Sequence, residues 1–257
     1  MSDIRVIISD VDGCITPEAS RTWISPAMTK FVRLCRTASA GKGSYPPITL
    51  CTGRPQPYVE AMMKMMDIRL PAICENGAVI YTLHDNRARY GPGVTREKID
   101  ALKEVRDFIE YDLLPKHRDC LLQFGKVAQV SVFSEKRESL AKLVPPIEKF
   151  VDALGKIELE IIPSVHYLNI SMSGVDKGRA TEELLKEINC HMEEAAGIGD
   201  TDGDLPLRDA VDFFACPANA SPELMMRADY RSGKKEITGV LDCLKAIRQE
   251  NNSRQRE

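Results

Sequence analysis

The sequence contains no apolar run of the length that crosses a bilayer, no block of basic residues and few aromatic residues, which make up 6% of the chain. A membrane-spanning helix needs about 20 consecutive apolar residues, so we expect no membrane partner. The formal net charge of −3 and the lack of basic clusters argue against a nucleic-acid partner. The first residues lack the charged and apolar regions of a signal peptide, which predicts a cytoplasmic protein.

Paired-cysteine and histidine metal motifs are also missing. The eight cysteines are scattered from position 14 to position 243 without a Cys-x-x-Cys pair, so we expect buried free thiols in a reducing compartment. The four histidines have no metal-ligand spacing, which gives little support to a zinc site or a catalytic triad. Walker and Rossmann phosphate loops are absent. Residues 200–204 fail as the start of a calcium-binding EF-hand, because Leu205 and Val211 occupy the positions that require Gly and Glu.

The first apolar run ends in two acids. Residues 5–9 are typical of a buried strand in a parallel sheet, and ligands bind beyond the carboxyl ends of such strands. Side chains alternate along a strand, so Asp10 and Asp12 can face the same side, and Gly13 permits a tight turn. Two carboxylates this close repel by about 4 kcal/mol at an effective dielectric near 20. A shared proton, a metal ion or a cationic partner must offset that repulsion.

The chain of 257 residues has room for one large domain or two modest ones, and its two ends share one pattern. Apolar strand segments alternate with amphipathic helices at 1–80 and again at 173–257, which predicts an α/β fold with a doubly wound, mostly parallel sheet. Strands are expected at 48–51, 72–74, 195–198 and 211–216. The polar tail from Asn251 is expected to fray.

Residues 81–172 have a different pattern and predict an inserted α+β domain. Thr95 is placed to cap a helix, and pairs of strand segments with few helices predict an antiparallel sheet. A second helix over 139–154 is expected to be interrupted or restarted at Pro145 and Pro146, and to stop at Gly155.

Polar groups from four segments are expected at one edge of the core sheet. Carboxylates can hold a hard divalent cation such as Mg²⁺, together with a substrate phosphate. A Thr-Gly pair suits phosphate oxygens, and a lysine at a helix start adds positive charge. This set fits phosphoryl transfer, in which catalysis is mostly positioning and charge stabilisation. The groups are Asp10 with Asp12, Thr52 with Gly53, Lys177, and Asp200 with Asp204.

Four motifs in this order resemble those of the haloacid dehalogenase (HAD) superfamily of phosphatases. They are Asp-Val-Asp-Gly at 10–13, Thr-Gly-Arg at 52–54, Asp-Lys-Gly at 176–178 and Gly-Asp-x-x-x-Asp at 199–204. The Glu-Asn-Gly-Ala run at 75–78 and the later Asn219 look like the Cof-type and sucrose-phosphatase-like branch. That branch carries a large α/β cap, which 81–172 would form. The resemblance covers nearly the whole chain.

The resemblance implies roles for these residues. Asp10 would attack phosphorus, Asp12 would act as general acid and then general base, and Lys177 would neutralise charge. Thr52 and Gly53 would hold the phosphoryl group. The expected Mg²⁺ ligands are Asp10, the backbone carbonyl of Asp12, Asp200, and Asp204 directly or through water. Arg54, Asn76 and Asn219 would either contact substrate or hold the loops together.

One position departs from the family pattern. The family usually has Asn immediately before the last acid of the fourth motif, whereas this chain has Gly203. Asp202, one residue earlier, is a substitute to consider, so the metal ligands beyond Asp200 are open. Cys14 beside the acids is expected to serve packing.

The sequence therefore predicts a magnesium-dependent phosphatase, monomeric or homodimeric, acting on a small phosphorylated metabolite such as a sugar phosphate or a phosphoglycolate-like acid. Loops near Lys126 and at 163–166 would select the substrate. A phosphomutase with the same Asp10 nucleophile is the main alternative. A response-regulator receiver would be about half this length, and a metabolite sensor would not need intact Asp10, Asp12 and Lys177.

Overall fold

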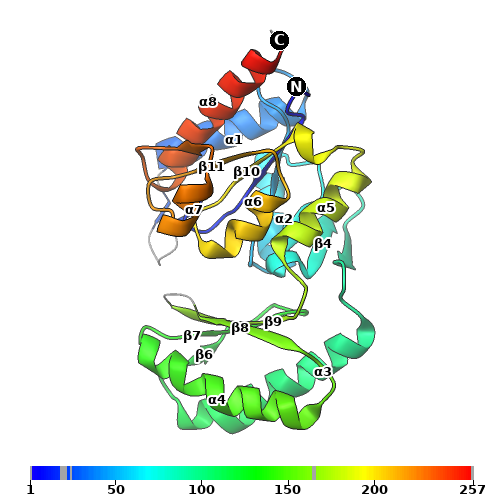
Figure 1. Cartoon of the computed structure of the whole chain (residues 1–257), viewed down its shortest axis with the longest axis vertical. Helices are drawn as coiled ribbons and strands as arrows, with labels where there is room; N and C mark the ends of the chain where they lie inside the picture. The colour runs from blue at the N-terminus through cyan, green and yellow to red at the C-terminus, as the bar shows by residue number, and fades with distance from the viewer. Residues whose placement is uncertain (1, 18–21, 24, 164–165, 256–257) are drawn as a thin grey trace. The chain divides into compact units, whose positions relative to one another are not determined.

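The computed structural model describes residues 2–17, 22–23, 25–163 and 166–255. They form two compact units, the first of residues 1–89 and 176–257 and the second of residues 90–175. The first unit contains a five-stranded sheet in the order β12-β11-β10-β1-β2, and every adjacent pair is parallel (Figure 1). The α/β class with a mostly parallel core sheet is confirmed. The strands are β1 (Val6–Ser9), β2 (Ile48–Leu50), β10 (Ala195–Ile198), β11 (Phe213–Cys216) and β12 (Tyr230–Arg231).

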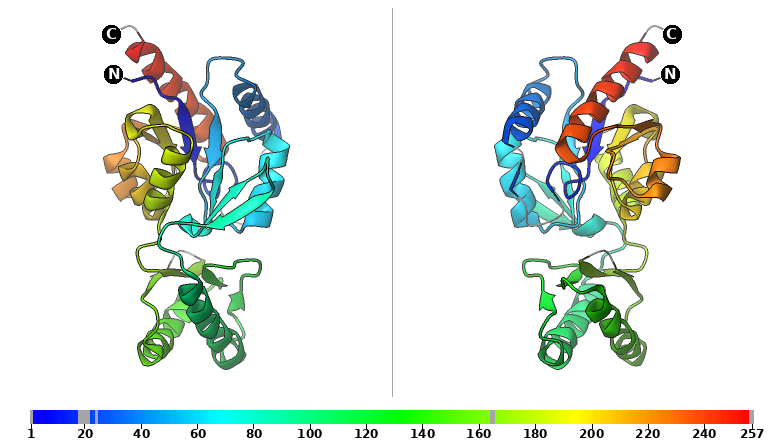
Figure 2. Two further views of the ribbon diagram at one scale, coloured as in Figure 1. Left: turned by 90° about the vertical axis from the view of Figure 1, so that its right-hand side faces the viewer. Right: turned by 90° about the vertical axis from the view of Figure 1, so that its left-hand side faces the viewer.

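Helices cover both faces of this sheet. Val6 and Ile8 of β1 lie in a buried cluster with apolar residues of α5, α6 and α7. On the other face α8 contacts β10 and β11, and it also packs against α1 (Figure 2). Both faces of β1 are therefore buried, which is why its sequence is apolar at every position. The helices are α1 (Ser25–Ser39), α2 (Gln56–Met66), α5 (Lys177–Glu187), α6 (Leu205–Asp209), α7 (Pro222–Arg227) and α8 (Glu236–Arg254).

The order of the strands places β1 at the point where the chain changes direction across the sheet. After β1 the chain adds β2 on one side, whereas after β10 it adds β11 on the other side. Ligands of open α/β sheets bind outside the carboxyl ends of the strands at such a point. The loops after β1 and β10 carry Asp10 and Asp200, so both acids lie at this position.

The strand at 72–74 was expected in the main sheet and instead belongs to a second one. β3 (Ala72–Cys74), β4 (Val79–Thr82) and β5 (Arg87–Tyr90) form a three-stranded sheet in which β3 and β4 are antiparallel. A single bridge between Cys51 and Ile73 links it to the main sheet. The antiparallel pairing keeps residues 81–89 with the first unit, so the expected boundary at 80 was too early. Residues 173–175 belong to the second unit.

The second unit consists of a four-stranded antiparallel sheet and two helices, α3 (Arg96–Asp107) and α4 (Arg137–Leu154). Figure 1 shows both helices on one side of this sheet. The side chain of Thr95 caps α3 by accepting a hydrogen bond from the backbone N–H of Lys98, at 3.3 Å. A π-helical segment (Phe108–Leu113) and a 3-10 turn (Leu114–Lys116) follow α3. The strands, in the spatial order β6-β7-β9-β8, are β6 (Leu121–Leu122), β7 (Val130–Phe133), β9 (Tyr167–Met172) and β8 (Leu159–Pro163).

Helix α4 differs from expectation, because it continues through Pro145 and Pro146 without interruption. Each proline lacks a backbone donor, but the buried side chains of Leu143 and Ile147 flank the pair, and their packing offsets the lost hydrogen bonds. Gly155 ends the helix in the left-handed conformation, with φ of 61°. Of the loop at 163–166, residues 164–165 lie outside the described residues.

The C-terminal segment is ordered where fraying was expected. Helix α8 runs to Arg254, and the Asn251 side chain accepts a hydrogen bond from the backbone N–H of Ile4 and donates one to its carbonyl, at 2.8 and 3.1 Å. The buried Arg254 guanidinium lies 2.7 Å from a carboxylate oxygen of Asp212. The contacts of Asn251 fix the tail to the first residues of the core, and the contact of Arg254 fixes it to the residue before β11. No helix in the described ranges is both long and apolar enough to span a bilayer.

Candidate active site

The turn after β1 carries two acids with different surroundings. Asp10 is buried at 5% exposure, and Asp12 is partly exposed. Gly13 has φ of +76°, and a Cβ atom at this position would lie 2.0 Å from a carboxylate oxygen of Asp200. The turn therefore needs glycine for two reasons, its backbone conformation and the close approach of the acid from the loop after β10.

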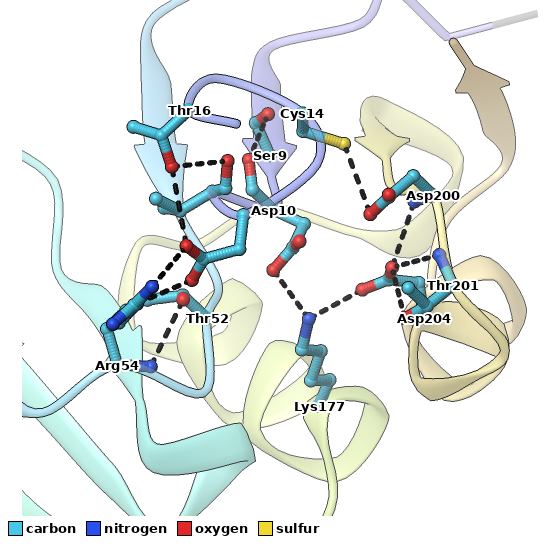
Figure 3. Close-up of polar contacts among 12 residues, drawn as sticks. Ser9, Asp10, Cys14, Thr16, Thr52, Arg54, Lys177, Asp200, Thr201 and Asp204 are labelled. Atoms are coloured by element: carbon cyan, nitrogen blue, oxygen red, sulfur yellow. Dashed lines mark hydrogen bonds and ion pairs between the residues drawn. The ribbon is translucent and has the colours of Figure 1, made fainter. Parts of the chain in front are cut away.

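Lys177 links Asp10 to Asp204. Its ammonium group lies 2.7 Å from Asp10 Oδ1 and 2.6 Å from Asp204 Oδ1, and all three side chains are at most 8% exposed (Figure 3). Lys177 is the first residue of α5, where Asp176 caps the helix by accepting from the backbone N–H of Arg179. The cap fixes the helix start, so the lysine side chain is held at the end of β1.

Burial and like charge govern the ionisation of these groups. Burial raises the pKa of Asp10 to about 7, because the lowering by Lys177 does not cancel it and Asp204 adds repulsion. Burial alone would lower the pKa of Lys177, but the Asp10 and Asp204 carboxylates raise it well above its ordinary value. Lys177 is therefore a fixed positive charge beside Asp10.

Asp200 lies on the other side of Asp10 and belongs to a group that could hold a metal ion. Donor atoms of Asp10, Cys14 and Asp200 all lie within 4.8 Å of one another, and all three residues are buried. Asp10, Asp200 and Asp204 with Lys177 sum formally to a charge of −2, which a divalent cation would balance. The carboxylate oxygens suit a hard cation such as Mg²⁺. Burial raises the pKa of the Cys14 thiol well above its ordinary value, so this group stays a neutral thiol that points at Asp200 Oδ1, 3.8 Å away.

Asn219 and Asp204 support the loops around Asp200. The Asn219 amide donates to the Gly13 carbonyl at 2.9 Å and to Asp200 Oδ2 at 3.0 Å, while its oxygen accepts from the Glu236 backbone N–H. The second oxygen of Asp204 accepts from the backbone N–H groups of Asp200 and Thr201, both at 3.0 Å. Both side chains are thus engaged with protein groups in the structure, and their expected contacts with substrate and metal stay predictions.

The Thr-Gly-Arg segment after β2 lies against the turn that contains Asn76. Thr52 is buried, and its hydroxyl accepts from the Arg54 backbone N–H at 3.2 Å. A Cβ atom on Gly53 would lie 3.0 Å from the Asn76 side-chain oxygen, so the amide packs directly over the glycine. Asn76 itself has φ of 54°, a left-handed conformation that asparagine tolerates better than most residues. Asn76 therefore shapes the loop that presents Thr52.

Arg54 forms a two-point ion pair with Asp12. Its Nε lies 2.7 Å from Asp12 Oδ2, and its Nη2 lies 2.7 Å from Asp12 Oδ1. The guanidinium carbon stacks 5.1 Å from the centre of the Tyr58 ring, and the Thr16 hydroxyl lies 3.4 Å from Asp12 Oδ1. A fork of parallel hydrogen bonds to a carboxylate is stronger and more directional than a single-point contact.

The structure brings together the residues of all four motifs, but it separates Asp202 from them. Asp202 is exposed and bonds the Ser221 hydroxyl, so it does not replace the missing asparagine from within the site. Sequence reasoning missed Thr16 and Tyr58. The only sequence signal for Tyr58 is its place four residues after Arg54 at the start of a helix, and Thr16 follows Asp12 at the same spacing.

Comparison with known proteins gives one family. The sequence profile described as haloacid dehalogenase-like hydrolase matches residues 7–119 and 116–244. A relative from Methanothermobacter thermautotrophicus named phosphoglycolate phosphatase is 26% identical over 244 residues, which is 94% of this chain and 98% of the relative. A protein of the same name from Thermoplasma volcanium is 26% identical over 233 residues, covering 89% and 92% of the two chains.

Solved structures share the fold. A protein from Thermoplasma acidophilum superposes with a TM-score of 0.72 at 20% identity and covers 96% of this chain and 99% of that one. The sucrose-phosphatase of Synechocystis sp. PCC6803 superposes with a TM-score of 0.62 at 16% identity, with coverage of 96% and 98%. The arrangement of strands and helices is therefore that of these proteins. Because the family profile matches most of the length of this chain, the chain belongs to the haloacid dehalogenase-like hydrolase family.

Proposed function

We propose that this hydrolase releases inorganic phosphate from a small phosphorylated metabolite, a sugar phosphate or a phosphoglycolate-like acid, through an aspartyl-phosphate and with Mg²⁺. The observation that carries the proposal is the buried triplet in which Lys177 bridges Asp10 and Asp204, at 2.7 and 2.6 Å. The lysine offsets charge where an anionic phosphate must approach a carboxylate. The names of the relatives, phosphoglycolate phosphatase and sucrose-phosphatase, support a phosphoric monoester as substrate.

In the first half of the proposed reaction, a carboxylate oxygen of Asp10 attacks phosphorus as the bond from phosphorus to the leaving oxygen breaks. Asp12 donates a proton to that oxygen, and the alcohol leaves. Thr52 and Gly53 hold the phosphoryl oxygens, and Lys177 neutralises their charge. Asp10, Asp200 and the Asp12 carbonyl, with Asp204 directly or through water, would hold Mg²⁺, which neutralises phosphate charge when bound.

In the second half, Asp12 takes a proton from water, and the resulting nucleophile attacks the phosphorus of the aspartyl-phosphate. The bond from phosphorus to Asp10 breaks, phosphate leaves, and both carboxylates return to their starting states. Asp12 thus needs to move a proton twice, which its partly exposed position permits.

The second unit is the part of the chain that would select the substrate. We assign residues 90–175 to the cap of this family, which would select the leaving group. All eight cysteines are free and buried, which supports a reducing compartment such as the cytoplasm.

The relatives are named phosphatases, which favours water over a second sugar hydroxyl as the phosphoryl acceptor. A phosphomutase is therefore the weaker alternative.

The test is phosphate release from a panel of small phosphoesters, with Mg²⁺ and then with EDTA. Wild type is compared with Asp10→Asn, which keeps an oxygen for Lys177 but removes the nucleophile, and with Asp100→Asn, which changes an exposed acid of the second unit. We expect Mg²⁺-dependent release that Asp10→Asn abolishes and Asp100→Asn retains. No release by the wild type from any phosphoester would contradict the proposal.

A further inference from the structure

The Arg54 fork, formed by the Nε and Nη2 atoms of its guanidinium group, binds a carboxylate in the structure. The fork already holds a carboxylate through two bonds of 2.7 Å, and Tyr58 stacks on the guanidinium and restricts its orientation. Both side chains of the pair are 26% exposed, so solvent and small solutes reach them. Lys177, in contrast, is 6% exposed and bridges two buried carboxylates. Of these two cations, Arg54 is the one that a second anionic group of a substrate can approach.

We infer that the substrates are phosphorylated carboxylic acids, and that the carboxylate of the substrate replaces Asp12 on the Arg54 fork. This inference rests on the proposed function and adds a substrate class to it. The replacement frees Asp12 to take up a proton from solvent and to turn toward the leaving oxygen. Recognition of the correct substrate and release of the general acid are thus one event.

The exchange costs Arg54 no hydrogen bond, because it swaps one carboxylate for another. Arg54 keeps two charge-assisted hydrogen bonds before and after, so the enzyme loses none at this residue when Asp12 departs. A phosphoester with a neutral leaving group must separate the pair without replacing it, which leaves the guanidinium with fewer strong bonds. The difference discriminates against neutral substrates.

The geometry of a short phosphorylated acid fits this exchange. In a 2-phosphorylated acid the carboxylate is attached to the carbon that bears the leaving oxygen. Asp12 must reach that oxygen to protonate it, and Asp12 is also in contact with Arg54. A substrate carboxylate near the leaving oxygen therefore lies close to the fork. Arginine suits this task better than lysine, because its planar fork matches the two oxygens.

The test compares 2-phosphoglycolate with 2-hydroxyethyl phosphate, in which a hydroxymethyl group replaces the carboxylate. We expect wild type to favour 2-phosphoglycolate in kcat/KM, and Arg54→Gln to reduce that preference on the order of 10- to 100-fold. Arg54→Lys keeps the charge without the fork and is expected to lose much of the preference. Arg69→Gln is the matched control, because Arg69 makes an exposed fork with Asp67 in the same unit.

A second readout is independent of turnover. Titration of 2-phosphoglycolate into Asp10→Asn, with and without Arg54→Gln, measures binding alone, and we expect the added change to weaken it at least tenfold. Circular dichroism melting checks that the variants fold. An equal loss on both phosphoesters, with unchanged binding, would show that Arg54 only positions Asp12 and would overturn the inference. Failure of the proposed function is distinct, since wild type would then release phosphate from neither compound.

Discussion

The carboxylate of Asp200 occupies the space that any side chain at Gly13 would need, with an oxygen 2.0 Å from the position of the missing Cβ atom. Asp200 comes from the loop after β10 and Gly13 from the turn after β1, so two segments far apart in sequence approach each other at this contact. Because Asp10 lies in the same turn, the contact also sets how close the two acids can come.

We predict that Gly13→Ala disrupts the site more than it disrupts the fold. The added methyl group must displace Asp200, and a displacement of about 1 Å at a reacting group can cost on the order of 100-fold in rate. Gly41→Ala is the control, because Gly41 has φ of +66° with nothing within 4 Å of the added atom. Both variants should lose about 1 kcal/mol of stability through backbone strain, measured by urea unfolding, while only Gly13→Ala should lose activity. Equal activities in the two variants would contradict the role of the contact.

Removing the Lys177 ammonium should destabilise the core. Lys177→Met leaves Asp10 and Asp204 buried without their shared partner, which costs about 3–5 kcal/mol. Adding Asp10→Asn removes one of the two charges, so the double variant should be more stable than Lys177→Met alone. Urea unfolding of the apoprotein measures both. A double variant that is the less stable of the two would show that charge repulsion is not the cause.

The control for this experiment is Lys64→Met. Lys64 pairs with Glu60 one turn earlier on α2, where Lys64 is 63% exposed. Exposed pairs of this kind contribute little to stability, because water screens their charges. The contrast between Lys64 and Lys177 therefore separates the effect of burial from that of losing a lysine.

Metal binding should stabilise the folded protein in a way that depends on Asp200. A ligand present at 100 times its Kd adds about 2.7 kcal/mol of stability, so Mg²⁺ should raise the Tm of wild type and EDTA should reverse the rise. Asp200→Asn should show no rise. Asp202→Asn, which changes the exposed acid two residues later, should respond like wild type. The opposite ranking would assign the metal to Asp202.

Asp242 should make the stability of the folded protein depend on pH. Burial raises its pKa, but hydrogen bonds from the hydroxyls of Tyr230 and Ser232 and the charges of Lys234 and Lys245 outweigh it, so the pKa lies below its ordinary value of 3.8. A carboxylate with a lowered folded-state pKa stabilises the protein above the unfolded-state pKa, and this stability is lost as the pH falls through the folded-state value. Wild type should thus be more stable than Asp242→Asn near neutral pH, and the difference should shrink below about pH 4. If the stability difference between wild type and Asp242→Asn grew as the pH fell, the pKa of Asp242 would be raised in the folded protein, not lowered.

Sequence reasoning succeeded where a local pattern determines the structure. The apolar run of β1 predicts a strand buried on both faces, and the acids after it were expected at the sheet edge where Asp10 is found. The Thr95 cap and the Gly155 stop also depend on a few neighbouring residues, and the structure confirms both. Propensity and capping act within one turn, so they can be read directly from the chain.

Prediction from the sequence was wrong where contacts between residues far apart in the chain determine the local structure. Pro145 and Pro146 predict a broken helix, but the apolar contacts of Leu143 and Ile147 hold α4 continuous. Asn251 belongs to a polar tail, yet its amide finds the backbone of Ile4. Such partners lie far away in the sequence, and no periodicity indicates them.

The Arg54–Asp12 pair shows the same limit within the site. Both residues belong to motifs that the sequence identifies, but the motifs assign each a separate task. That they bind one another, with Tyr58 stacked on the arginine, depends on the path of the loop after β2 and on the rotamers of both side chains.

The position of β1 in the sheet has a consequence for synthesis of the chain on the ribosome. β1 ends at Ser9, yet its neighbour β10 begins only at Ala195, so most of the chain must be translated before this strand can pair on both edges. Until then the segment that contains Asp10 has an exposed apolar strand edge, and Asp200 has not yet been made. We expect protease sensitivity of this segment in stalled nascent chains to disappear only once β10 has emerged. No partly made chain would then carry the complete group of Asp10, Lys177 and Asp200.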